Sequence, residues 1–120
     1  MKGLIDESLR ALVELPVAAA HSGERTQLTA WVDTAFNGGL TIPREQIAAL
    51  KLLRQSQVDA ILADGSQVVL ETFTCFVDWF GKTYGTQITA SDGHCALLGT
   101  MLLDNRRLCV DYKARTVEIE

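Results

Sequence analysis

The sequence predicts a mostly β domain, and three observations lead to that prediction. The chain has 120 residues, a length that suits one domain with its own apolar core. Hydrophobic residues make up 48% of the chain and charged residues 22%, which is the balance of a globular protein rather than a disordered one. Short segments rich in Val, Ile and Thr are separated by the turn sequences Ser22-Gly23, Asn37-Gly38-Gly39, Asp64-Gly65 and Asp92-Gly93. We therefore expect residues 1–120 to form one all-β domain with one or two short helices.

A β-hairpin is the first element that the pattern predicts. Apolar and polar residues alternate from Leu9 to Val17, Ser22-Gly23 supplies a turn, and Thr26–Val32 forms the returning strand. Because the alternation has a period of two, the apolar side chains from Leu9 onward are expected to bury one face.

A short helix follows from about Pro43 to Lys51, and we expect it to be the longest helix of the chain. Proline is well suited to a first helical turn, Glu45 is favoured by the dipole there, and Ile47 and Leu50 follow at a spacing of three.

A second hairpin is predicted around Asp64-Gly65-Ser66, because Asp-Gly is favoured in tight hairpin turns. Its strands are Gln57–Leu62 and Gln67–Trp79, and we expect it to project from the body of the domain. Further strands are predicted at residues 83–89, 108–112 and 116–119, with a helical turn between residues 100 and 105.

Charge and hydropathy exclude several classes of partner. The net charge of −4 argues against a general affinity for nucleic acids or anionic membranes. The longest stretch without charged residues, Gly93–Leu103, is far shorter than the ~20 residues that a membrane helix needs. The first ten residues carry four charged side chains and lack an apolar signal segment, so we expect a cytoplasmic protein. The basic side chains near the end of the chain are expected to form a solvated surface: Arg106, Arg107, Lys113 and Arg115.

The cysteines suggest neither a disulfide framework nor a zinc site. Cys75, Cys95 and Cys109 are odd in number and lack the C-x-x-C spacing. We expect reduced thiols in the core.

The most informative segment for chemistry is residues 31–43. Here Asp33 leaves an apolar strand and enters a loop of small residues, where the backbone can hold the carboxylate rigidly and a substrate chain has room to approach. An aspartate that caps a turn after a strand accounts equally well for this segment taken alone.

A second apolar segment, Ala96–Leu103, follows at a distance that lets it run beside the first. Together the two segments make the chain resemble the single-domain retropepsin-like aspartic proteases, and their small bacterial members more than the retroviral enzymes. Asp33-Thr34-Ala35 is similar to the Asp-Thr-Gly triplet of that family, and Leu97-Leu98-Gly99 to its hydrophobic-hydrophobic-Gly motif. Thr100–Leu103 is similar to the short helix after that motif, and the turn at the second hairpin is similar to the tip of the family's flap: Leu62, Ala63, Asp64, Gly65 and Ser66. The resemblance spans roughly residues 9–119.

This resemblance implies a closed retropepsin-like β-barrel with a flap hairpin, assembled as a homodimer. It further implies an aspartic endopeptidase in which Asp33 of each subunit contributes to a pair that shares one proton. One carboxylate activates a water molecule, and the protonated one donates to the scissile carbonyl of a peptide or protein substrate. Thr34 would hold the two loops together through its hydroxyl, and the flaps would close over the substrate. No cofactor or metal is implied, and because the pair must hold one proton, the optimum should be acidic.

Three positions depart from the family pattern. Ala35 replaces a Gly, so its methyl group would narrow a neighbouring pocket and would distort the loop if that Gly needs a positive φ. Thr100 and Asn37 occupy the positions where retroviral relatives have an Arg and an Asp that form an ion pair. Because both charged residues are replaced, no buried charge is left without a partner. Two other functions stay open: a dimeric peptide-binding or scaffold protein on the same fold, and an unrelated small β-barrel that binds a ligand.

Two further groups of side chains bear on function. His21, His94 and the cysteines lack ligand spacing, so we expect neither a metal centre nor a thiol catalyst. The aromatic residues lack the basic groove that nucleic-acid stacking needs. We expect them in the core and in pocket walls: Trp31, Phe36, Phe73, Phe76 and Trp79.

Overall fold

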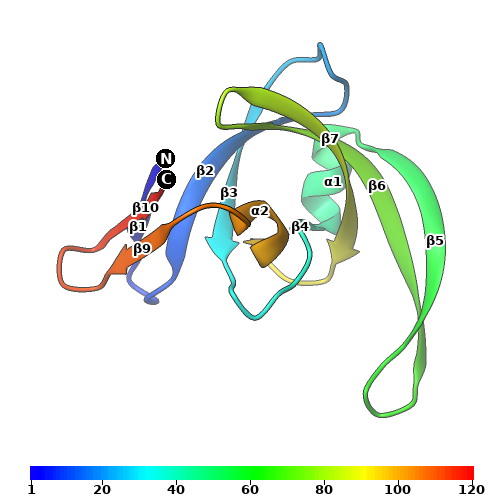
Figure 1. Cartoon of the computed structure of the whole chain (residues 1–120). Coiled ribbons are helices and arrows are strands. Elements are labelled where there is room, and N and C mark those ends of the chain that lie inside the picture. The colour runs from blue at the N-terminus through cyan, green and yellow to red at the C-terminus, as the bar shows by residue number, and fades with distance from the viewer.

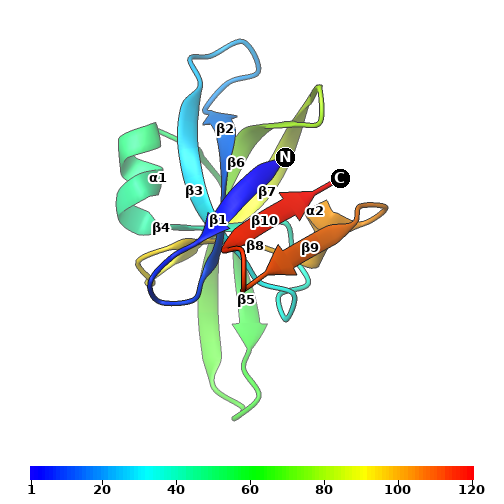
Figure 2. The same cartoon turned by 90° about the vertical axis from the view of Figure 1, so that its left-hand side faces the viewer.

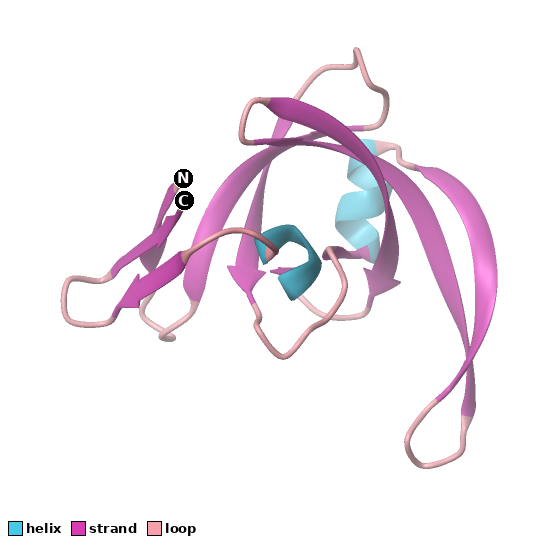
Figure 3. Cartoon of the chain, viewed as in Figure 1, coloured by secondary structure: helices cyan, strands magenta, loops and turns pink.

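The computed structural model covers residues 1–120 and describes all of them except the side chain of Val58. Over these residues the chain forms ten strands and two short helices, so the mostly β prediction is confirmed (Figures 1 and 3). The strands are β1 (Lys2–Ile5), β2 (Ala11–Ala18), β3 (Thr26–Val32), β4 (Leu40–Pro43), β5 (Leu53–Ile61), β6 (Gln67–Trp79), β7 (Lys82–Ser91), β8 (Ala96–Leu98), β9 (Leu108–Asp111) and β10 (Thr116–Ile119). The helices are α1 (Arg44–Leu50) and α2 (Thr100–Leu103).

Six strands close into a barrel in the order β6-β7-β4-β8-β3-β2. The closure is made where Val17 and Ala18 of β2 pair with Val77 and Phe76 of β6. Alternate side chains of β2 point inward, so Val13, Leu15 and Val17 are buried, as the period of two predicts. Closing the sheet removes the free edges that an open sheet of these strands would expose.

A smaller antiparallel sheet extends from the barrel in the order β2-β1-β10-β9. Lys2 pairs with Glu118, and the amino group of Met1 donates a hydrogen bond of 2.8 Å to the carbonyl oxygen of Ile119. The two termini therefore lie side by side (Figure 2). Strand β9 is the outermost strand of this sheet.

Strands β5 and β6 form the projecting hairpin that the Asp-Gly turn predicts (Figure 1). Strand β6 has the predicted bounds, whereas β5 begins at Leu53, earlier than expected. The apolar side chains near the two ends of β5 are exposed, with Ile61 74% accessible and Leu53 71%.

Helix α1 confirms the prediction for residues 43–51 and is the longer of the two helices described. Pro43 occupies its N-cap position, and Lys51 ends it in the left-handed conformation with φ 57°. Helix α2 is a single turn directly after β8, within the predicted range. No helix among the residues that the structure describes is long and apolar enough to span a membrane.

Several local expectations are wrong. Leu9 is 55% exposed with φ 63°, because it lies in the turn between β1 and β2 and not in the hairpin strand. Trp31 is 39% exposed rather than a core residue, since it alternates with inward-facing neighbours on β3. Of the three thiols only Cys75 is fully buried, while Cys95 is half-buried and Cys109 is exposed. Strands β1, β4 and β8 were not predicted.

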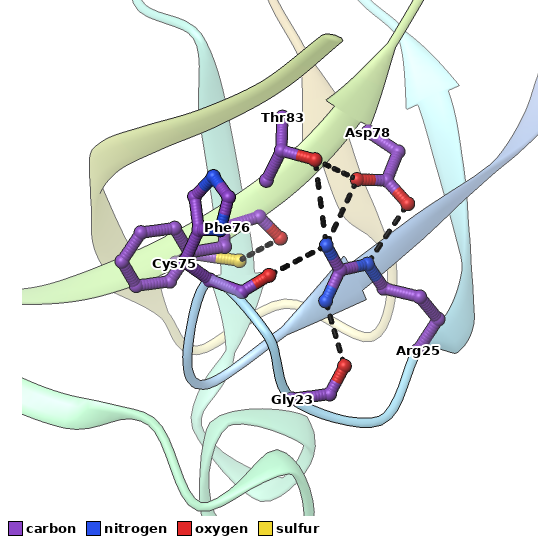
Figure 4. Close-up of polar contacts among 7 residues, drawn as sticks. Gly23, Arg25, Cys75, Phe76, Asp78 and Thr83 are labelled. Atoms are coloured by element: carbon purple, nitrogen blue, oxygen red, sulfur yellow. Dashed lines mark hydrogen bonds and ion pairs between the residues drawn. The ribbon is translucent and has the colours of Figure 1, made fainter. Parts of the chain in front are cut away.

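Hydrogen bonds of Arg25 join the loop between β2 and β3 to the hairpin end of β6 and β7 (Figure 4). This end of the barrel lies opposite the projecting hairpin (Figure 1). Arg25 contacts the Asp78 carboxylate through Nε at 2.8 Å and donates to the carbonyl oxygens of Gly23 and His21. The Thr83 hydroxyl donates to the same carboxylate at 2.7 Å. Hydrogen bonds from Arg25 and Thr83 hold the pKa of Asp78 below its usual value.

Candidate active site

Asp33 lies directly after β3, at the start of a loop that crosses from β3 to β4. These two strands do not pair with each other, because β8 lies between them, parallel to β3 and antiparallel to β4. The backbone N–H of Asp33 donates a 2.9 Å hydrogen bond to the carbonyl oxygen of Leu98 at the end of β8. Two segments that are far apart in the sequence thus fix the start of this loop.

The residues that follow β8 hold this loop through backbone hydrogen bonds. The N–H of Gly99 donates to the Gly39 oxygen at 2.8 Å, and the N–H of Thr100 donates to the Phe36 oxygen at 2.8 Å. A Cβ atom at Gly99 would lie 2.6 Å from the Phe36 oxygen and also against the Gly38 oxygen. Gly99 is therefore required for close approach of two backbones, not for a special φ.

The Asp33 carboxylate is oriented by its own loop. Its Oδ1 accepts a 2.9 Å hydrogen bond from the N–H of Ala35, and its backbone oxygen accepts one of 3.2 Å from Phe36. The residue is half-buried, whereas Thr34 and Ala35 are exposed. One oxygen is thus fixed while the other, Oδ2, accepts no hydrogen bond from the residues that the structure describes.

Ala35 does not strain this loop. Its φ is not positive, whereas five other non-glycine residues of the described chain have a positive φ. The backbone conformation at position 35 therefore does not require a glycine. The loop distortion that would follow from a positive φ at Ala35 does not occur. What Ala35 changes is the surface of the loop, because its methyl group is exposed to solvent.

The second sequence-predicted group forms the tip of the β5–β6 hairpin. Asp64 Oδ1 accepts hydrogen bonds from the Ser66 hydroxyl at 2.6 Å and from the Ser66 N–H at 2.9 Å, which lowers the pKa of this carboxyl. Gly65 has φ +85°, a conformation that favours glycine, and Ala63 is exposed beside it. The tip and the Asp33 loop both lie at the lower end of the molecule as drawn in Figure 1.

Sequence reasoning did not single out the role of Phe36. Its ring lies so close to Gly38 and Gly99 that an added Cβ at Gly38 would meet Cζ at 2.5 Å. The Phe36 side chain therefore packs inside the loop that carries Asp33, and its carbonyl anchors α2. The sequence feature that could have indicated this packing is Asn37-Gly38-Gly39, because a ring can lie this close to the backbone only where the neighbouring residues are small.

The other side-chain groups do not assemble into a site. Within the part of the chain that the structure describes, no three His, Cys, Asp or Glu side chains gather where they could hold a metal ion. Burial raises the pKa of the Cys75 thiol to about 11, so this thiol is far from a reactive thiolate at neutral pH.

Two solved structures resemble this chain over most of its length. A retropepsin-like aspartic protease from Rickettsia conorii superimposes with a TM-score of 0.61 at 15% identity, covering 98% of this chain and 86% of the other. The EIAV protease complexed with the inhibitor HBY-793 superimposes with a TM-score of 0.59 at 17% identity, covering 83% and 90%. The chain has the retropepsin-like fold. No family model and no curated protein sequence matches it.

The retropepsin-like fold brings two of the three sequence motifs together. Asp33-Thr34-Ala35 and Leu97-Leu98-Gly99 meet where β3 and β8 end, with Trp31 paired to Leu97 and Val32 to Leu98. The flap turn lies at the tip of its own hairpin, apart from both. The retropepsin-like fold that the resemblance implies is thus confirmed. Sequence identities of 15% and 17% show a shared fold and do not show a shared activity.

Proposed function

We propose that this protein is an aspartic endopeptidase whose active site forms between two copies of residues 1–120. The observation that carries the proposal is the setting of Asp33 at the end of β3, in a chain with the retropepsin-like fold. The residue is half-buried, its backbone N–H donates to the Leu98 oxygen, and its carboxylate accepts a hydrogen bond from the Ala35 N–H. Each chain supplies one such aspartate, so a second copy must supply the other.

The chemistry needs two carboxylates with different protonation. Two Asp33 side chains that face each other across a two-fold axis cannot both ionise easily, so they share one proton. The ionised member removes a proton from a bound water molecule while the protonated member donates to the carbonyl oxygen of the scissile peptide bond. The Ala35 N–H holds Oδ1 of Asp33, while Oδ2 accepts no hydrogen bond from the described residues. Oδ2 is therefore free to hold or release the shared proton.

The neighbouring residues take supporting roles in this proposal. In this proposal Thr34, which is exposed, contacts the loop of the second copy, and the flap turn from Ala63 to Ser66 closes over the bound peptide. Ala35 borders the substrate and narrows the adjacent side-chain pocket. Exclusion of water by the flap would strengthen every polar interaction with the reacting peptide.

The test compares the parent with Asp33→Asn on a fluorogenic peptide library between pH 3 and pH 8. The parent should cleave peptides with a bell-shaped pH profile and an acidic optimum, and its activity per chain should fall on dilution. Asp33→Asn keeps the shape of the side chain but removes the shared proton, so turnover should fall by about 10²–10⁴-fold or more. Circular dichroism and sedimentation should show an unchanged fold and assembly.

A matched control is Asp104→Asn, which neutralises an exposed aspartate after α2 and should leave turnover unchanged. Asp33→Asn cleaving at the parental rate would contradict the assignment of the dyad. An assembled parent that stays inert at every pH, together with an inert Ala35→Gly variant, would favour the peptide-binding or scaffold function instead.

A further inference from the structure

One row of side chains crosses five strands on the face of the sheet that points away from the core. Trp31 of β3 pairs with Leu97 of β8, and Leu97 pairs in turn with Thr41 of β4. Thr41 pairs with Thr89 of β7, and Thr89 pairs with Thr72 of β6. Because paired residues of adjacent strands have their side chains on the same face, these five side chains lie next to one another.

Burial identifies this face as the outer one. The residues that alternate with the row along β3, β4, β7 and β8 are buried in the core: Ala30, Val32, Leu40, Ile42, Ile88, Ala96 and Leu98. Trp31 is exposed by contrast, and Leu97, Thr41 and Thr89 are half-buried. Since Val32 points inward, the alternation that turns Trp31 outward also turns Asp33 outward. The row therefore begins beside Asp33.

The chemistry of the row changes between β8 and β4. Trp31 and Leu97 are apolar, whereas the three residues that follow in the row carry hydroxyl groups. The Thr72 hydroxyl is paired with that of Ser56 at 2.8 Å. Thr41 Oγ1, in contrast, is buried without a hydrogen-bond partner among the described residues. A buried hydroxyl without a partner costs free energy that a bound hydrogen-bonding group can recover.

A hollow of about 280 Å³ lies beside the hydroxyl end of the row. Ser91 follows Thr89 by two residues on the same face of β7, and its Oγ is likewise buried without a partner among the described residues. Ser91 lines the hollow together with Pro43, the residue of β4 with which it pairs. A side chain bound at this end therefore has a hydrogen-bonding wall and space beyond it.

The charged groups of the hollow leave little for a charged ligand to bind. Arg44 lines the hollow and donates from Nη1 to Glu71 at 2.9 Å and from Nε to Asp92 at 3.1 Å. A bound anion would have to displace one of these carboxylates from the arginine. Glu45, which also lines the hollow, is exposed and stays solvated. A neutral polar group pays neither penalty.

We propose that Thr41, Thr89 and Ser91 form a hydroxyl subsite for the substrate peptide, which selects a neutral side chain that both donates and accepts hydrogen bonds. This inference rests on the proposed function, because it concerns the peptide that lies over Asp33. Hydroxyl groups donate and accept, and so does the carboxamide of glutamine. Glutamine is the best match, since its chain is long enough to extend from the row into the hollow.

The hydroxyl subsite lies within three residues of the scissile bond. Strand β4 is the second strand from β3 in the sheet, and strands are about 4.8 Å apart, so Thr41 is roughly 10 Å from the line of β3. An extended peptide advances about 3.3 Å per residue, so three residues span that distance. Trp31 and Leu97 lie between, where an apolar substrate side chain is favoured.

The test uses peptide libraries in which one position, up to three residues from the scissile bond on either side, holds Gln, Met or Glu. These side chains are similar in length but differ in hydrogen bonding and in charge. At one position we expect kcat/KM of the parent to be about ten-fold higher for Gln than for Met or Glu, because one or two hydrogen bonds distinguish them.

The variants Thr41→Val and Ser91→Ala remove the two hydroxyls that have no partner. The Gln-to-Met ratio should fall about three-fold in Thr41→Val and to about one in the double variant. The urea midpoint should not fall, since neither hydroxyl bonds to a described residue, and a merely structural role would lower it. The matched control Thr116→Val changes an exposed threonine on β10 and should keep the parental ratio.

A parent that cleaves without preferring Gln at any of these positions would overturn this proposal and leave the proposed function standing. A preference that persists in the double variant would do the same. If the parent does not cleave, binding of the same peptides is measured by fluorescence anisotropy. Tighter binding of the Gln peptide that the double variant loses would support the subsite and contradict the endopeptidase, whereas binding without preference, or no binding, would overturn both.

Discussion

Replacing Gly99 by alanine tests whether close backbone packing positions the Asp33 loop. The added methyl group would lie 2.6 Å from both the oxygen and Cδ2 of Phe36, with the Gly38 oxygen also in contact. Two of these three atoms belong to the backbone, so a side-chain rotation cannot relieve the overlap. The loop must move away from β8.

The cost of that movement has two parts. Overpacking of this kind costs about 1–3 kcal/mol. The hydrogen bonds from Gly99 to Gly39 and from Thr100 to Phe36, both 2.8 Å, would lengthen, and each contributes about 0.5–1.5 kcal/mol. We expect Gly99→Ala to lower the free energy of unfolding by about 2–6 kcal/mol, a fall in melting temperature of roughly 8–24 °C for a chain of this size.

Urea and thermal unfolding followed by circular dichroism measure this effect. The matched control is Gly39→Ala in the same loop, where the nearest atoms to an added Cβ are Leu102 Cγ at 3.8 Å and Met101 Sδ at 3.9 Å. This variant should unfold within about 1 kcal/mol of the parent, since those contacts are ordinary. A Gly99→Ala protein within about 0.5 kcal/mol of the parent, or a control that is equally damaged, would refute the packing argument.

Two further predictions concern titratable groups. The pKa of Asp78 is held low by Arg25, so its stabilising effect should be complete above the unfolded-state pKa of about 3.9 and be lost as the pH falls through the folded-state value. The urea midpoint of Asp78→Asn should therefore lie below that of the parent at pH 7 and converge with it toward pH 3, and parallel curves would contradict the linkage. Because burial raises the pKa of Cys75 to about 11, iodoacetamide at pH 8 should label the exposed Cys109 rapidly and Cys75 only after unfolding, as followed by mass spectrometry. Equal labelling rates in the folded protein would show that β6 opens readily.

Local sequence determined those elements whose conformation depends on near neighbours. The period of two over residues 11–17 marks an inward-facing strand, Asp64-Gly65 marks a turn with a positive φ, and Pro43 marks the start of α1. The resemblance carried by Asp33-Thr34-Ala35 and Leu97-Leu98-Gly99 was sufficient for the fold, which the structure confirms. The roles of these residues stay predictions.

Tertiary structure decided what depends on pairing between distant segments. Strands β4 and β8 have only four and three residues, too few for a periodic signal, and they exist because β8 fits between β3 and β4. The closeness of Gly99 to Phe36 arises in the same way. The propensity of a residue sets the backbone conformation that it prefers. Which strand its N–H and C=O groups pair with depends on the order and register of the whole sheet.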